Sequence, residues 1–283
     1  MPVKQAVTGI TVRANVLKAT PKKNNVERIY ALGFRTGKFS VHTSRTMMLA
    51  ELKTLLAVSP PEATRDDYFR GIIEDNLLGK TTLKARNLTA QHLAELYSLD
   101  ANVCLFRVLR CLWVMEEQAR PVLALLCALA RDTLLRASLD RILQAQAGEH
   151  LSTVDMVAWL GSQLPERFSR ATITSTAQNI NSTWTQSGYL SGKRNKKRTL
   201  PLITPAAVTF ALLLAYVEGA RAQRLFDSFW VNALDTPKDK IHDLAVAAFQ
   251  HGWLDYRRAG DVIDIRFPNL LSIHEQELLS EQT

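Results

Sequence analysis

The chain has 283 residues, 47% of them hydrophobic, which is enough to bury a substantial core in one large or two modest domains. Its 35 Lys and Arg residues outnumber its 27 Asp and Glu residues and give a formal net charge of +8, which favours a polyanionic partner. The longest apolar runs, residues 121–130 and 206–217, fall short of the roughly 18 to 20 residues that cross a bilayer. We therefore expect buried helices in these runs and no membrane partner.

The three cysteines, Cys104, Cys111 and Cys127, lie in apolar helical patterns and have no metal-ligand spacing. An odd number of buried cysteines is typical of free thiols in a reducing compartment. Because the first residues carry no secretory signal pattern, the sequence predicts a cytoplasmic protein.

Residues 1–38 are strongly basic, with eight Lys or Arg residues and a single acid, Glu27. Their Val, Thr and Ile residues are typical of extended chain, and no amphipathic basic helix of the kind that binds membrane surfaces is evident. We therefore expect a basic arm or edge strands. Positive charge concentrated in this way steers polyanions toward a protein and makes binding fall with salt.

Residues 39–150 predict a helical bundle, because their apolar side chains recur at the spacing of an α-helix. Pro60 and Pro61 separate the first expected helix from the second, because proline disrupts the interior of a helix. The expected helices cover residues 43–57, a stretch from Thr64, about 82–98, about 102–117, and one or two helices within 119–146.

Gly79-Lys80-Thr81-Thr82 resembles the end of a phosphate-binding loop. That motif needs a glycine five positions before Gly79 and a preceding strand, whereas position 74 is Glu and the stretch follows an expected helix. We therefore exclude nucleotide binding at this motif.

A helix with an unusual polar face is expected over residues 172–186, after a shorter helix over 152–163. Its apolar stripe consists of Ile173, Ala177, Ile180 and Trp184, spaced by three or four residues. Ser, Thr and Asn are poorer helix formers than Glu and Lys, so a face built from them indicates another use. Asn and Gln suit the edge of adenine in particular. That face carries Ser175, Gln178, Asn179, Ser182 and Gln186.

A very basic turn follows this helix. Gly188 is expected to end the helix, and strands are expected at residues 189–190 and 200–203. Between them lie five positive charges in six residues, here called the basic turn: Lys193, Arg194, Lys196, Lys197 and Arg198. A polar helix that leads into a basic hairpin is the order of a winged helix-turn-helix. The sequence therefore predicts a winged-helix-like module over residues 151–204.

The predicted contacts with DNA follow from this order. Arg167 and Arg170 precede the polar helix, where phosphate contacts usually lie. A solvated surface helix followed by a solubilising loop is the alternative interpretation of the same pattern. The predicted DNA-binding residues are Arg167, Arg170, Ser175, Gln178, Asn179, Ser182, Lys193, Arg194, Lys196, Lys197 and Arg198.

A similar order of elements returns in residues 205–283. A connecting helix over 205–217 is followed by a helix that ends at Gly252 and by an alternating strand around Ile263 and Ile265. This predicts a second winged-helix-like module. Its helix carries Asp239 and Asp243, so it suits phosphate less well than the first.

The sequence offers no catalytic constellation. The six histidines have no metal-ligand spacing, and there is no Cys-x-x-Cys pair. The adjacent acids at 66–67 and 116–117 lie on expected helices, where neighbours point about 100° apart and do not converge. We therefore expect no enzyme activity, metal or cofactor.

Several features occur in a familiar order along most of the chain. Residues 34–46 lead into a helix, residues 75–81 read DNLLGKT with Arg86 after them, and residues 130–135 read ARDTLL. The polar helix with Trp184 and its Gly-Tyr-Leu exit into a hairpin come last. From Gly33 to about Pro268 this order resembles the BrxA family of bacteriophage-exclusion (BREX) defence systems. The resemblance implies a small, mostly helical, non-enzymatic accessory protein that binds DNA beside the system's methyltransferase, ATPase and phosphatase-like components.

The sequence thus predicts a mainly α protein, with an N-terminal helical bundle followed by winged-helix-like modules with short β-hairpins. We expect it to bind double-stranded DNA as an accessory protein of a BREX-type system, with other BREX components as further partners. An RNA-binding helical protein and a protein-interaction scaffold of the defence complex are the alternatives. Few aromatic residues are interleaved with the basic segments, which counts against RNA.

Overall fold

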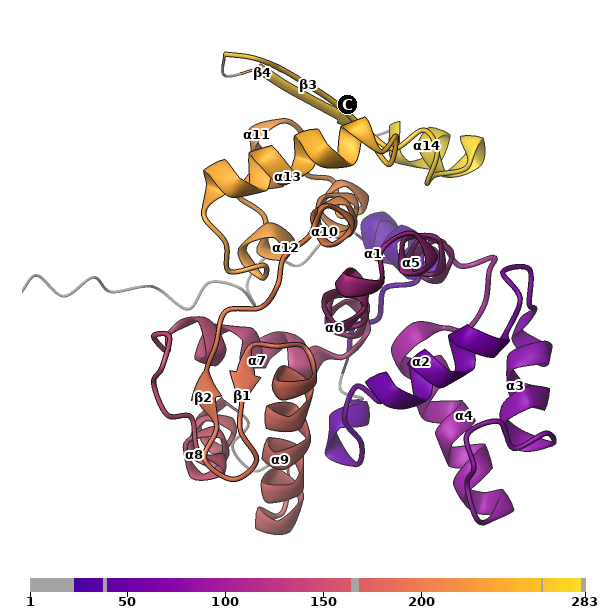
Figure 1. Cartoon of the computed structure of the whole chain (residues 1–283), viewed down its shortest axis with the longest axis vertical. Coiled ribbons are helices and arrows are strands. Elements are labelled where there is room, and N and C mark those ends of the chain that lie inside the picture. The colour runs from indigo at the N-terminus through magenta and orange to yellow at the C-terminus, as the bar shows by residue number, and fades with distance from the viewer. Residues whose placement is uncertain (1–22, 38–39, 164–167, 261, 281–283) are drawn as a thin grey trace, which may run out of the picture.

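A computed structural model describes residues 23–37, 40–163, 168–260 and 262–280. The fold is mainly α-helical, and in the described part the strands form two small antiparallel hairpins (Figure 1). The predicted fold class is therefore confirmed.

The predicted basic arm is partly wrong. Residues 23–31 form helix α1 (Lys23–Ala31), while residues 1–22 of the predicted arm lie outside the described residues. Eight of the eleven Val, Thr and Ile residues that indicated extended chain precede this helix. Its apolar side, marked by buried Ile29 and followed by buried Leu32 and Phe34, packs into the core. The helix therefore depends on tertiary packing more than on its own propensity.

The N-terminal bundle has the predicted helices, with one shifted boundary. Helix α2 begins at Leu49 and not at residue 43, because Met48 adopts a left-handed φ of 53° and residues 44–48 are irregular. A short 3₁₀ helix, η1, precedes them. The elements are η1 (Val41–Thr43), α2 (Leu49–Val58), α3 (Arg65–Ile73), α4 (Leu83–Tyr97), α5 (Cys104–Met115), η2 (Glu117–Ala119) and α6 (Arg120–Arg131).

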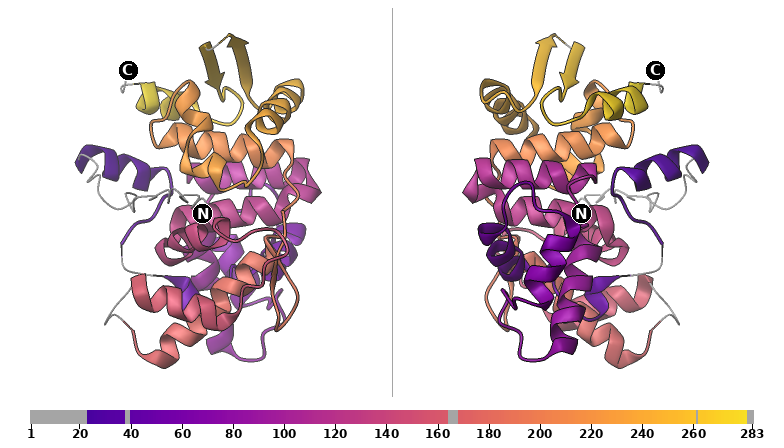
Figure 2. Two further views of the ribbon diagram at one scale, coloured as in Figure 1. Left: turned by 90° about the vertical axis from the view of Figure 1, so that its left-hand side faces the viewer. Right: turned by 90° about the vertical axis from the view of Figure 1, so that its right-hand side faces the viewer.

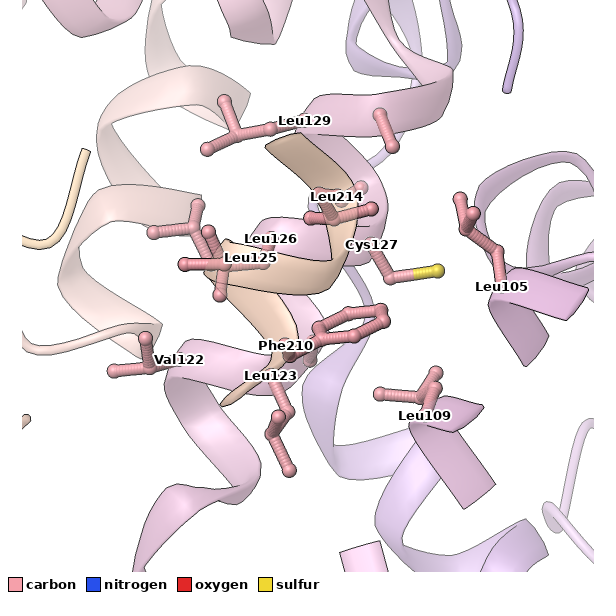
Figure 3. Close-up of a cluster of buried hydrophobic side chains, with 14 of the residues drawn as sticks. Leu105, Leu109, Val122, Leu123, Leu125, Leu126, Cys127, Leu129, Phe210 and Leu214 are labelled. Atoms are coloured by element: carbon pink, nitrogen blue, oxygen red, sulfur yellow. The ribbon is translucent and has the colours of Figure 1, made fainter. Parts of the chain in front are cut away.

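Helix α6 lies at the centre of the core and is buried on all sides from Val122 to Arg131. Helix α10 (Pro205–Val217) crosses it, and Figure 3 shows Phe210 and Leu214 of α10 among leucines of α6 and α5. A helix that is apolar all round is typical of such an interior position. The two longest apolar runs of the sequence are thus the two most deeply buried helices. Within the described ranges, no helix has the length and apolar character needed to cross a membrane.

The first hairpin is the last element in a run of three helices and one short extended segment. Antiparallel pairing of Leu190 with Arg198 and of Ser191 with Lys197 forms the hairpin. Lys197 pairs with Ser191 on one side and with His150 on the other. The segment around His150 is thus a third extended segment, and it lies in sequence between the first and second of the three helices. The order is helix, strand, helix, helix, hairpin. Its elements are α7 (Thr133–Leu143), the bridge at His150, α8 (Thr153–Gln163), α9 (Arg170–Gln186), β1 (Leu190–Ser191) and β2 (Lys197–Arg198).

The return strand is displaced from the prediction, which placed it at residues 200–203. Gly192 has a φ of +93°, and its α-carbon faces the carbonyl of Asn195, so the chain reverses within a tight turn. Pairing therefore begins at Lys197, and Leu200 and Leu202 lie exposed after the strand. Gly188 does leave the helix at a φ of +87°, as predicted.

The second hairpin follows helix α13 in the predicted order. Gly252, at a φ of +72°, turns the chain out of α13. Ile263 and Ile265 face the core while Val262 and Arg266 face solvent, as the alternating pattern indicates. Figures 1 and 2 place this hairpin at one end of the long axis and α8 and α9 toward the other. The elements are α11 (Gln223–Phe226), α12 (Phe229–Asn232), α13 (Lys238–Gln250), β3 (Asp255–Ala259), β4 (Val262–Arg266) and α14 (Ile273–Ser280).

Candidate nucleic-acid interface

The apolar stripe of α9 fixes the helix in place. Ala177, Ile180 and Trp184 are fully buried, as predicted. The Trp184 indole N–H donates to the hydroxyl of Ser138 on α7 at 2.9 Å. The Trp184 and Tyr189 rings pack edge to face with their centroids 5.0 Å apart. Tyr189, the first residue after Gly188, is therefore anchored as well. The position of the hairpin is therefore set by the same contacts that seat the helix.

The predicted polar face of α9 is covered in large part by the protein itself. The segment of residues 40–49, which contains η1 and the start of α2, lies against it and exchanges hydrogen bonds with it. The Asn179 amide donates to the His42 carbonyl at 3.0 Å, and the Ser175 hydroxyl donates to the carbonyls of Thr172 and Thr43. The Gln186 side-chain oxygen accepts from the Leu49 N–H at 3.2 Å.

These contacts correct part of the predicted DNA surface. A buried irregular segment brings backbone N–H and C=O groups that need partners, and the short polar side chains of α9 supply them. Ser175 and Asn179 are thereby committed to internal contacts, and Ser182 is half-buried with its hydroxyl next to the Gln186 amide. Docking of residues 40–49 accounts for Ser175, Asn179 and Gln186 without any ligand, whereas Gln178 stays exposed.

A buried polar cluster ties the same segment to α9 and α7. The Asp132 carboxylate accepts from the Ser40 hydroxyl, from the Val41 N–H and from His42 Nδ1, the last two at 2.8 Å. His42 Nε2 lies 2.9 Å from the Thr183 hydroxyl of α9, which also accepts from the Met47 N–H. The exposed fraction of the His42 and Asp132 side chains is 0% and 1%.

Asp132 is held ionised in this cluster. It also caps α7, because its carboxylate accepts from the backbone N–H groups of Leu134 and Leu135. Burial alone would raise the pKa of the Asp132 carboxyl. The His42 side chain and the hydrogen bonds from Leu135 and Ser40 outweigh that effect and hold the pKa at about 2.

The N-terminal half of α9 stays accessible. Arg170 and Gln178 are exposed, and Thr174 lies half-exposed between them at a spacing of four residues, so the three share one face. Ser169 caps the helix by accepting from the Thr172 N–H. The predicted contact Arg167 lies outside the described residues. The sequence prediction missed Thr174, although its spacing from Arg170 and Gln178 was available as a signal.

Three of the five cations of the basic turn point to solvent. Lys193, Arg194 and Lys197 are exposed. Lys196 is half-buried, and its ammonium group donates to the Thr185 hydroxyl at 2.7 Å, tying the turn to α9. Burial lowers the pKa of Lys196. The turn therefore presents three exposed cations on a hairpin that is tied to α9 at Thr185.

Arg198 was predicted to hold phosphate, and that prediction is wrong for the folded protein. Its exposed fraction is 2%, and its guanidinium donates to the Ile142 carbonyl at 3.0 Å and the Tyr189 carbonyl at 3.1 Å. It also pairs with Asp235. Because Lys197 and Arg198 alternate on a strand, one faces solvent and the other faces the core.

The second hairpin carries its own exposed arginines. Arg257, Arg258 and Arg266 face solvent on β3 and β4. The adjoining helix α13 exposes Asp239 and Lys238, with Asp243 one turn further along the same helix. The charge of this surface is therefore mixed, in contrast to the basic turn.

Among residues 23–37, 40–163, 168–260 and 262–280, no three His, Cys, Asp or Glu side chains lie together in a way that suits a metal ion. Cys104, Cys111 and Cys127 are free thiols, and burial raises the pKa of each. A scan of the chain against protein-family models finds no match. A search of curated proteins finds no significant match either.

Proposed function

We propose that the protein binds double-stranded DNA through its first winged-helix module, as a non-enzymatic accessory protein. The observation that carries this proposal is the placement of Lys193, Arg194 and Lys197, exposed and without carboxylate partners among the described residues, on a hairpin beside α9. Clustered cations on one surface are the electrostatic footprint of a nucleic-acid-binding protein. The overall charge of +8 acts in the same direction.

The module offers a definite docking geometry. A helix-turn-helix inserts its second helix into the major groove, with the N-terminal residues of that helix at the base edges. On α9 the N-terminal half is the accessible part, so Gln178 and Thr174 are the side chains that would reach bases. Arg170 and the three exposed cations of the basic turn would hold phosphates on either side. Ser175, Asn179, Ser182 and Arg198 have no part in this geometry.

Replacing Lys193, Arg194 and Lys197 with alanine is expected to weaken duplex binding. Removal of one phosphate-binding cation reduces the slope of log K against log salt by about 0.9, so the slope should fall by up to about 3. Because all three side chains are exposed, stability should change by less than about 0.5 kcal/mol for each. Mobility-shift titrations at about 50 and 200 mM salt measure both the affinity and the slope.

A matched control separates local contacts from net charge. Lys53, Lys84 and Arg224 are exposed and lie on α2, α4 and α11, so their triple alanine variant removes the same charge elsewhere. It should keep most of the affinity and the slope. Unchanged binding by the hairpin variant, or equal weakening in both variants, would contradict the assignment of the basic turn.

Two further experiments distinguish the alternatives. RNA and duplex DNA can be made to compete for the protein at equal salt. A higher affinity for RNA than for duplex DNA would favour an RNA-binding function. A scaffold function would be supported by partners that are retained after nuclease treatment, together with no measurable duplex binding.

We further propose a BREX-type phage-defence system as the setting, with other BREX components as partners, on the resemblance of residues 33–268 to the BrxA family. Neighbouring genes for a methyltransferase, an ATPase and a phosphatase-like protein would support this setting. A gene neighbourhood without them would contradict it.

A further inference from the structure

A cavity of about 400 Å³ opens between α3, α4, the end of α6 and the segment that follows α1. Its volume lies in the range of small-molecule binding sites. Three arginines line it: Arg35 from that segment, Arg65 from the first turn of α3 and Arg131 from the last turn of α6. The cavity is separate from the basic turn and from the exposed half of α9, so what it binds does not depend on duplex binding.

Arg131 forms the floor of the cavity and is rigidly held. Its exposed fraction is 8%. Its guanidinium donates to the carbonyls of Glu95 at 2.8 Å and Ala94 at 3.2 Å, and also to that of Gly33. A guanidinium has five N–H donors, and these neutral carbonyls leave its charge uncompensated. Arg131 is therefore a preorganised cation with donors to spare.

The other two arginines are held above it. The Arg65 guanidinium lies 4.9 Å from the ring centroid of Phe69 and donates to the Ser98 carbonyl at 3.3 Å. Arg35 donates to the Phe34 carbonyl at 3.1 Å. Within the described part of the chain, no carboxylate comes within salt-bridge distance of any of the three.

The three cations act on one another. Burial is the main cause that lowers the pKa of Arg131 to about 10; Cys127 opposes it, and the charges of Arg35 and Arg65 lower this pKa further. Like charges gathered around one cavity repel each other, and a bound anion would relieve that repulsion.

Glu95 is the one acid among the described residues that line the cavity, and its carboxylate is already engaged. Gln91 donates to Glu95 Oε1 at 3.0 Å, and His92 Nδ1 lies 3.1 Å from Oε2. Three arginines and one glutamate leave about two positive charges, which matches a phosphomonoester dianion at neutral pH. A carboxylate ligand would supply only half of that charge.

We propose that this cavity binds the phosphomonoester of a small organic molecule. The phosphate lies among Arg35, Arg65 and Arg131, because guanidinium groups match phosphate oxygens with paired N–H donors. The organic part lies along the apolar wall of Phe69, Ala94 and Val41, and the hydroxyl groups of Thr36 and Thr133 at the rim supply further hydrogen bonds.

Calorimetric titration of the full chain in a phosphate-free buffer tests this proposal. The probes are inorganic phosphate, adenosine 5′-monophosphate and adenosine. Phosphate and the monophosphate should bind at one site per chain, and adenosine should bind at least about tenfold more weakly than the monophosphate, because the charge-assisted hydrogen bonds are absent. The variant Arg35→Gln/Arg65→Gln should weaken both phosphate probes by about tenfold or more.

Two controls keep the result interpretable. Arg131 is left unchanged because it holds three carbonyls, whereas Arg35 and Arg65 are exposed and their replacement should leave the unfolding midpoint in urea unaltered. Arg224→Gln removes one exposed guanidinium far from the cavity and should bind the probes as the parent does. Equal binding by parent and double variant, or no binding of either phosphate probe at about 10 mM, would overturn the proposal.

Discussion

Replacing Asp132 with alanine is expected to lower the free energy of unfolding by about 3–5 kcal/mol, which makes it one of the two most damaging substitutions foreseen here. The carboxylate accepts from the Ser40 hydroxyl, from the N–H groups of Val41 and Leu134, and from His42. Without it, these buried donors have no acceptor, and α7 loses its N-cap. Urea unfolding at pH 7 measures the loss.

The same carboxylate predicts a pH signature. Its pKa is about 2 in the folded protein against an ordinary value of 3.8, so the ionised form contributes about 2 kcal/mol of stability above roughly pH 4. That contribution disappears as the pH falls from about 4 to 2, because in this range the unfolded chain binds a proton that the folded state does not. Asp132→Asn should unfold with a correspondingly weaker dependence on pH in this window. A loss of less than about 1 kcal/mol in Asp132→Ala would contradict the role given to the cluster.

Replacing Arg198 with alanine is expected to cost about 3–5 kcal/mol of stability, although it belongs to the basic turn, where exposed cations are the rule. The carbonyls of Ile142 and Tyr189 would be left buried without donors, and Asp235 would lose its cationic partner. The neighbouring Lys197 is exposed and provides the matched comparison. Lys197→Ala should change stability by less than about 0.5 kcal/mol while weakening duplex binding.

Substitutions of Arg198 and Lys197 should therefore separate the stability of the protein from its duplex binding. Urea unfolding and duplex titration on both single variants measure them. If Arg198→Ala kept its stability but lost duplex affinity, the structural role given to Arg198 would be contradicted and Arg198 would belong to the DNA-binding surface.

Local patterns predicted the helices before the first hairpin well, but its return strand was predicted at residues 200–203 and lies at Lys197–Arg198. The spacing of Ala177, Ile180 and Trp184 defined the buried side of α9, and Gly188 marked its end because only a residue tolerant of positive φ fits there. The bundle helices were predicted for the same reason, since apolar spacing reports burial. The start of α2 was missed because the left-handed Met48 depends on contacts made elsewhere in the chain.

The candidate site was predicted less well, because its errors depend on distant partners. The sequence of the basic turn does not reveal that Arg198 meets Asp235, which lies 37 residues later. Strand alternation offered one signal, since Arg198 is the register partner of the buried Leu190. The polar face of α9 was assigned to DNA because side chains that read bases also pair with backbone. Only the docking of residues 40–49 distinguishes these two uses.

That docking has a consequence for synthesis on the ribosome. His42 meets Thr183 across 141 residues of sequence, and Met47 meets the same threonine across 136. At about 5–20 residues per second, residues 40–49 wait on the order of ten seconds for α9 to emerge. Such contacts of high sequence separation also slow folding in general. We therefore expect chains stalled before residue 183 to be cleaved by protease within residues 40–49, and full-length chains to resist cleavage there.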